Sequence, residues 1–271
     1  MAQLEQSLGN AGAAGKWEAV YRKLKDKINE LYWDEQDGFY YDVAIESRQP
    51  CRIRTMASYW PLLAGVASPA QAEKMVKYLR DPQEFGGNYP TPTLSRRDRD
   101  YHDQTGDYWR GGIWLPTTYM TVKALEEYGY HEEADMIAEK IIRQQLAAYH
   151  GIKPHTIWEC YSPSANEPST EHGRRARPEF CGWSALGPIS LFIENVLGFH
   201  KVSALRNEIQ WRLKREKGRH GLKNLHFGTT TTDIVFDGKN TVDVTSNNPY
   251  SLVINGKKYA IKPGTASITL K

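Results

Sequence analysis

The chain has 271 residues, enough for one large domain or two smaller ones with a buried core. Its 35 Lys and Arg nearly balance 32 Asp and Glu, for a net charge of +3. The basic residues form no long stripe, so we expect no nucleic-acid partner. No apolar run is long enough to cross a bilayer, so we expect no membrane helix. Residues 1–7 lack the basic start and apolar centre of a signal peptide, and the compartment stays open.

Apolar residues spaced by three and four from Trp17 to Leu31 predict the first amphipathic helix, and residues 1–16 read as a lead-in. Ser68 followed by Pro69 fits a helix start, while Gly129 and Gly198 fall where helices would end. Five further helices are expected at about 55–66, 69–80, 114–128, 131–148 and 183–197. Short links between neighbours favour antiparallel helical hairpins.

Two connections between these helices are much longer, at about 81–113 (the first long connection) and 149–182 (the second long connection). Loops of this length are uncommon, and ordered ones often carry function. We expect both connections to meet at one end of the helical array.

After about residue 205 the pattern changes to short alternating runs with turn signals, among them Asp237-Gly238, Asn247–Pro249 and Asn255-Gly256. Such signals predict hairpins. We therefore expect a helical domain at 1–205 and a small antiparallel β extension at 206–271, with its strands in 222–271.

Aromatic side chains gather in three segments at the long connections, Gly106–Trp114, Thr156–Tyr161 and Phe180–Pro188. Eight Trp and sixteen Tyr occur in the whole chain. Aromatic rings with polar edges suit sugars, whose C–H faces are apolar and whose rims carry hydroxyls. The pattern favours a carbohydrate site.

Glu159 is the leading candidate for acid or base chemistry because Trp158 and Tyr161 flank it. A carboxyl held among rings has a raised pKa, which suits proton transfer. The competing interpretation is a loop carboxylate paired with Arg110 or Lys153.

A second group has two interpretations. Asp107 and Arg110 could bind sugar hydroxyls while Trp109 or Trp114 lies under the ring. Alternatively, the Asp–Arg pair caps a helix and the indoles lie in the core. The same choice, core packing or stacking on a ligand, applies to Trp183.

Three cysteines, Cys51, Cys160 and Cys181, are too few for a disulfide framework, although one bridge between Cys160 and Cys181 stays open. No Cys/His spacing matches a zinc site, and no cofactor is expected. Calcium held by loop carboxylates also stays open.

The run GDYWRGGIWLPTTYMTVKAL resembles the GDYWRGPIW segment of glycoside hydrolase family 63 and its mannosylglycerate-hydrolase-like and trehalase-like relatives. TIWECY resembles the W-E-[NQ]-Y segment of that family, and FCGWSAL its F-x-G-W-[ST]-A-L. The resemblance runs in order from about Trp17 to Gly198. It implies part of an (α/α)6 toroid, mainly α, and an inverting α-glycosidase that is α-glucosidase-like and acts on an oligosaccharide or small glycoside. It assigns the base to Glu159 and sugar contacts to Asp107, Tyr108, Trp109, Arg110, Trp114, Trp158, Tyr161 and Trp183.

The sequence departs from the family at three points. The resemblance places the general acid, an Asp, upstream of Trp17, and no Asp occurs before Asp26. About six helices are predicted where a closed toroid needs twelve. We therefore expect a C-terminal portion that is inactive alone. Alternatives are a non-catalytic sugar-binding remnant, or a subunit whose toroid a partner chain or dimer completes. Gly112 stands where Pro is usual, and Cys160 where Asn or Gln is usual.

Overall fold

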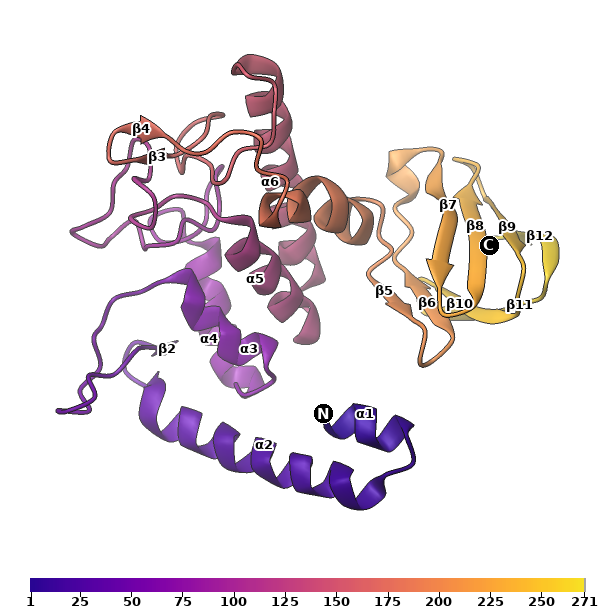
Figure 1. The fold of residues 1–271 in the computed structure, drawn as a ribbon, viewed down its shortest axis with the longest axis horizontal. Helices are drawn as coiled ribbons and strands as arrows, with labels where there is room; N and C mark the ends of the chain where they lie inside the picture. Colours follow the sequence, from indigo (N-terminus) through magenta and orange to yellow (C-terminus); the bar gives the residue numbers. More distant parts are fainter. Residues whose placement is uncertain (271) are drawn as a thin grey trace. The chain divides into compact units, whose positions relative to one another are not determined.

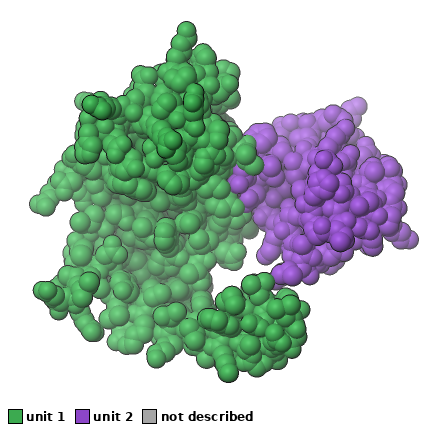
Figure 2. All heavy atoms as spheres, viewed as in Figure 1, with its two compact units in different colours: residues 1–189 green, residues 190–271 purple. Residues whose placement is uncertain are grey.

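The computed structural model describes residues 1–270, which form two compact units (Figure 2). The first unit covers residues 1–189 and the second begins at Ser190. The division falls inside the predicted helix at 183–197, earlier than the expected boundary at 205. The reason is packing: Ile193 and Leu197 lie against the core of the second unit.

The first unit is mainly helical, with two small strand pairs (Figure 1). Its helices and 3₁₀ turns are α1 (Ala2–Ser7), α2 (Ala11–Tyr32), η1 (Met56–Tyr59), α3 (Trp60–Leu63), α4 (Pro69–Arg80), α5 (Leu115–Glu127), α6 (His131–Gly151) and η2 (Trp183–Leu186). The π-helix η3 (Gly187–Val196) spans the division. The strand pairs are β1 (Trp33–Asp34) with β2 (Phe39–Tyr40), and β3 (Thr170–Glu171) with β4 (Arg174–Arg175).

The predicted bounds of helix α4 are confirmed, because residues next to its first turn determine where it starts. The Ser68 hydroxyl accepts the Gln71 N–H, and the Gln71 side chain accepts the Ser68 N–H, which forms a capping box. Helices α5 and α6 form a predicted hairpin, and Gly129 in their short link has φ +81°. Gly198 likewise follows η3 with φ +88°. These glycines end helices in a conformation that other residues disfavour.

The lead-in prediction for residues 1–16 is wrong, since α1 and the start of α2 are helical there. Three alanines within residues 11–14 favour a helix without any tertiary contact. No residue of α2 is buried. Its middle contacts the segment after α3, where the Tyr21 hydroxyl and the Lys25 ammonium both donate to the Gly65 carbonyl at 2.8 Å.

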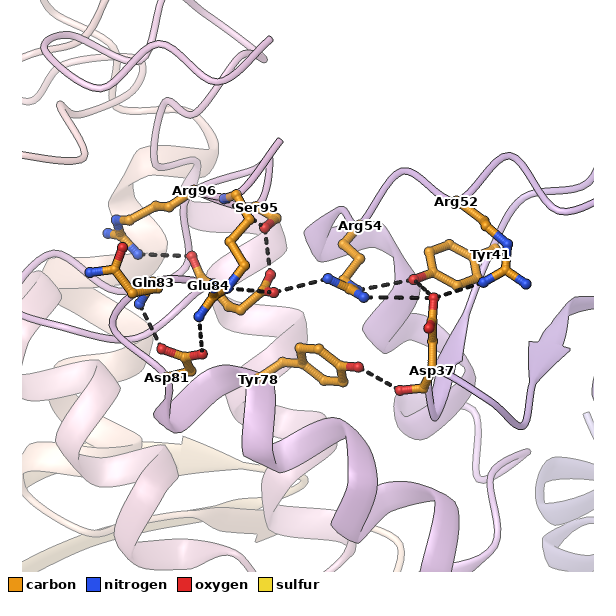
Figure 3. Close-up of polar contacts among 11 residues, drawn as sticks. Asp37, Tyr41, Arg52, Arg54, Tyr78, Asp81, Gln83, Glu84, Ser95 and Arg96 are labelled. Carbon is orange, nitrogen blue, oxygen red and sulfur yellow. Dashed lines mark hydrogen bonds and ion pairs between the residues drawn. The ribbon is translucent and has the colours of Figure 1, made fainter. Parts of the chain in front are cut away.

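A buried carboxylate joins the end of α4 to two loops of the first unit (Figure 3). Glu84 is 3% exposed and accepts hydrogen bonds from Arg54 Nη1 at 2.9 Å and from the Ser95 hydroxyl. Arg97 lies 3.3 Å from the same carboxylate. Arg54 reaches further, with Nε donating to the Tyr41 hydroxyl at 3.0 Å. A buried charge requires such partners.

The second unit contains two four-stranded sheets. Its strands are β5 (Lys201–Ser203), β6 (Glu208–Trp211), β7 (His220–Phe227), β8 (Thr230–Phe236), β9 (Thr241–Ser246), β10 (Tyr250–Ile254), β11 (Lys257–Ile261) and β12 (Gly264–Thr269). The orders are β11-β10-β6-β5 and β12-β9-β8-β7. Alternate residues of β8, β9 and β10 are buried, and their side chains share one core with Trp211 and Phe199.

Three β predictions need correction. Strands β5 and β6 lie ahead of residues 222–271, where all the strands were expected. The unit is not wholly antiparallel, because β6 and β10 pair in parallel, with Leu252 opposite Ile209. The turn signal at residues 247–249 also forms no hairpin: β9 already has β8 and β12 on its two edges, so β10 joins the other sheet. The turn at Asn255-Gly256 is confirmed as a hairpin between β10 and β11. With 37% helix and 22% strand, the chain is a mixed helix-and-sheet protein.

Candidate active site

The two long connections lie side by side in the first unit, as the sequence predicts. Single β-bridges join Pro92 to Ile113, Ile113 to Tyr161, and Tyr161 to Pro168. Ile113 and Tyr161 exchange two backbone hydrogen bonds, of 2.8 and 3.0 Å. This ladder places the residue before Trp114 next to the segment that carries Glu159.

The Gly106–Trp114 segment is a tight loop that depends on glycine. The Gly112 N–H donates to the carbonyls of Gly106 at 3.0 Å and Tyr108 at 3.1 Å. A Cβ on Gly112 would lie 2.4 Å from the Tyr108 oxygen. Proline, usual in the resembled family, has no N–H to donate, so this loop differs there in its bonding. Asp107 and Tyr108 have φ of +23° and +63°, a strained conformation that the loop enforces.

Aromatic rings form a continuous layer at this loop. Trp109 stacks on Trp114 with ring centres 4.2 Å apart and planes 3° from parallel. Tyr108 meets the same ring edge-on at 4.7 Å, and Trp183 lies 5.9 Å from it. Phe180 lies 4.8 Å from Trp183. Trp114 is buried, whereas Trp109 is 52% and Trp183 43% exposed, so two indoles offer open surface to a ligand.

Asp107 does not cap a helix, which removes one interpretation of the Asp–Arg pair. Helix α5 begins after Trp114, with no side-chain cap. Asp107 instead accepts the His172 N–H at 2.9 Å and lies 3.4 Å from Arg110 Nη1. Arg110 Nε also donates to the Asp100 carbonyl at 3.0 Å. The pair therefore ties the aromatic loop to the turn between β3 and β4.

Glu159 is half-buried, and within residues 1–270 no hydrogen bond or ion pair engages its carboxylate. Burial, followed by the charges of Glu159 and Glu171, raises the pKa of Tyr108. Burial is also the main reason that the pKa of Cys160 rises to about 12, with contributions from the same two carboxylates. Glu159 and Glu171 thus share this neighbourhood, and Glu159 has a carboxylate available for chemistry.

The remaining predicted sugar contacts, Trp158 and Tyr161, are 2% and 1% exposed. In this structure they lie beneath the surface, and a role in binding stays a prediction. All three cysteines are free thiols, so Cys160 and Cys181 are not bridged.

Sequence reasoning did not single out three residues of this region, Glu171, Gln145 and Ser184. Glu171 lies in a polar hairpin, and Gln145 lies on a helix with an ordinary amphipathic pattern. Ser184 falls inside the third aromatic motif, which was the one usable signal. No group of three or more His, Cys, Asp or Glu among the described residues could hold a metal ion. Across the same residues, no helix has the length and apolarity to span a bilayer.

Comparisons with known proteins show which proteins this chain resembles. The family model of the mannosylglycerate hydrolase MGH1-like glycoside hydrolase domain matches residues 1–180. A mannosyl-oligosaccharide glucosidase of Saccharomyces cerevisiae is 26% identical over 199 residues, covering 68% of this chain and 23% of that protein. The chain spans less than half the length of the curated relatives it matches.

Two solved structures share the fold. A GH63 mannosylglycerate hydrolase from Thermus thermophilus, in complex with glucose, has a TM-score of 0.56 at 19% identity, covering 71% of this chain and 43% of that chain. A sialidase structure has a TM-score of 0.69 at 17% identity, covering 99% of this chain and 24% of that chain. Since the family model matches well over half of its residues, this chain belongs to the mannosylglycerate hydrolase MGH1-like glycoside hydrolase domain family.

Proposed function

We propose that this chain carries the base side of an inverting α-glycosidase site, with Glu159 as the general base. One observation carries the proposal: the Glu159 carboxylate has no protein partner within residues 1–270, in a region where exposed Trp109 and Trp183 offer sugar-sized faces. A half-buried carboxylate without a protein partner can bind a water molecule directly, which a general base must do.

In this mechanism Glu159 takes a proton from a water molecule as its oxygen attacks the anomeric carbon from the face opposite the leaving group. A second carboxyl, which is protonated, gives its proton to the leaving oxygen. In inverting enzymes the two carboxyl groups lie about 6.5–9.5 Å apart. From the resemblance, we expect this acid, an Asp, on a segment that precedes the helix at Trp17. The position of the acid is part of the proposal.

The surrounding side chains divide by exposure. Trp109 and Trp183 would stack against sugar faces, while Asp107 and Arg110 would contact hydroxyls at the edge of the layer. The buried Trp114, Trp158 and Tyr161 would form the floor that holds these groups in place. We further propose that the helices of the first unit form part of an (α/α)6 toroid; the hairpin of α5 and α6 supports this arrangement.

Glycosyl fluorides test the base without depending on the acid, because fluoride leaves without protonation. Water replaces fluoride at the anomeric carbon: the C–F bond breaks, a C–O bond forms, and the base takes the proton. We expect the chain to hydrolyse α-glucosyl or α-mannosyl fluoride, measured with a fluoride electrode. Glu159→Gln should lower kcat by about 100-fold or more.

Glu171→Gln is the matched control, because Glu171 is the other carboxylate that acts on Tyr108 and Cys160. It should keep most of the activity. Loss of activity in Glu171→Gln with retention in Glu159→Gln would refute the assignment. Saccharide binding without hydrolysis of either fluoride would instead favour the non-catalytic binding protein.

A further inference from the structure

Two consecutive glutamines of α6 are buried, and they hold different segments: Gln144 binds the second long connection, and Gln145 binds the turn η2 that follows it. Gln144 Nε2 donates to the carbonyls of Ser162 at 2.6 Å and Ala165 at 2.8 Å, beyond the candidate base. Gln145 Nε2 donates to the Ser184 carbonyl at 3.2 Å. Neighbouring side chains of one helix thus reach two separate stretches of the chain around the candidate base.

Ser184 continues the contact to Glu159 itself. Ser184 is fully buried, and its hydroxyl donates to the Glu159 carbonyl at 2.8 Å. The Glu159 N–H donates to the Arg177 carbonyl at 2.9 Å. Both backbone polar groups of Glu159 are therefore fixed, one of them by the hydroxyl of Ser184, whose own backbone carbonyl accepts from Gln145.

Tyr161 lies on the other side of the base, and its hydroxyl accepts the Trp158 N–H at 3.1 Å. Burial raises the pKa of Tyr161, and the nearby side-chain amide of Gln145 opposes this rise. The space for this amide depends on Gly187, where a Cβ would lie 1.7 Å from Gln145 Oε1. The buried Gln145 amide is therefore fixed beside this segment, and its hydrogen bond reaches Glu159 through Ser184.

We propose that Gln145 and Ser184 are positioning residues for Glu159: they hold its backbone so that the carboxylate faces the attacked carbon. This inference rests on the proposed function of Glu159. Both side chains are buried, so we expect them to act on the orientation of Glu159 and not on the substrate itself. If one partner of a buried hydrogen bond is removed, the other partner is left unsatisfied at the full cost of its desolvation. Breaking these bonds is therefore unfavourable, and the segment stays in one arrangement.

The first test needs no catalysis. Hydrogen exchange by mass spectrometry would follow the amides of residues 157–161 in Gln145→Met, Ser184→Ala and the control Gln144→Met. Gln145→Met and Ser184→Ala should speed exchange of these amides at least about tenfold, while Gln144→Met should affect mainly residues 162–166. Unchanged exchange at 157–161 in both test variants would overturn the proposal.

The second test uses the fluoride assay. Gln145→Met and Ser184→Ala should lower kcat by about 10- to 100-fold with KM within about twofold, since a small misplacement of a catalytic group has this effect. Ser184→Thr, which keeps the hydroxyl, should recover most of the rate. Azide should restore turnover of Glu159→Ala by attacking in place of water, but should not restore Gln145→Met, whose base is still present.

Normal kcat in both test variants would overturn the proposal even if exchange changes. A chain that hydrolyses neither fluoride would refute the proposed function of Glu159. The exchange result would then decide by itself whether Gln145 and Ser184 fix this segment, so the two failures are distinguishable.

Discussion

The buried carboxylate of Glu84 gives the sharpest prediction about stability. Glu84→Ala removes a charge that accepts from Arg54 and Ser95 and lies 3.3 Å from Arg97 (Figure 3). The Arg97 side chain is 56% exposed and can turn to water. Arg54 is 24% exposed and remains behind as a partly buried cation.

Removing one partner of a buried ion pair costs roughly 3–5 kcal/mol. The lower end applies here, because Arg54 keeps its bond to Tyr41 and its ion pair with Asp37 at 3.6 Å. We therefore expect a loss of about 3 kcal/mol, or a decrease in Tm of about 6–12 °C for a unit of this size.

Urea unfolding followed by Trp fluorescence would measure the loss, because seven of the eight Trp lie in residues 1–189. Glu18→Ala provides the control, since Glu18 and its partner Arg22 are exposed and such pairs contribute at most about 1 kcal/mol. A loss for Glu84→Ala below about 1 kcal/mol, or equal to that of the control, would refute the reasoning.

Two further predictions concern the thiols and two glycines. Burial raises the pKa of Cys160 to about 12, so this thiol is neutral at pH 8. In a titration with a disulfide reagent, Cys51 and Cys181 should react fast and Cys160 slowly, because only the thiolate reacts. Three equal rates would contradict this prediction. Gly256 has φ +82° and Gly12 lies in α2, with open space at both. Gly256→Ala should therefore lower stability by about 1 kcal/mol, and Gly12→Ala should raise it by about 0.5–1 kcal/mol, by thermal unfolding. Shifts of the same sign would contradict this account.

Local signals predicted the helices well. Ser68 and Pro69 marked the start of α4, and Gly129 marked the end of α5, because each acts within one turn of the helix. Residues 1–16 were not predicted as helical because they have no amphipathic pattern, whereas alanine favours a helix without one.

Contacts between residues that lie far apart in the sequence could not be predicted from local signals. The parallel pairing of β6 with β10 joins strands about forty residues apart in the sequence, and no turn signal between them predicts it. The π-helical form of residues 187–196 could not be predicted either, because the spacing of apolar residues distinguishes only a helix from a strand.

The candidate site divides in the same way. The aromatic motifs indicated that Trp109, Trp114 and Trp183 belong together, and their rings are in contact or nearly so. The hydrogen bonds of Gln145 depend on which carbonyls the folded chain presents to α6, so no motif could show them. Glu171 was missed because it enters the site only through the β3–β4 hairpin.

The most direct test of the central claim is the stereochemistry of the first product. Proton NMR during hydrolysis of α-glucosyl or α-mannosyl fluoride would show which anomer forms before mutarotation. We expect the β-anomer to appear first with the unchanged chain, and Glu159→Gln to form it at least about 100-fold more slowly. An α-anomer as the first product, or normal β-anomer formation by Glu159→Gln, would contradict the assignment of Glu159 as the base of an inverting glycosidase.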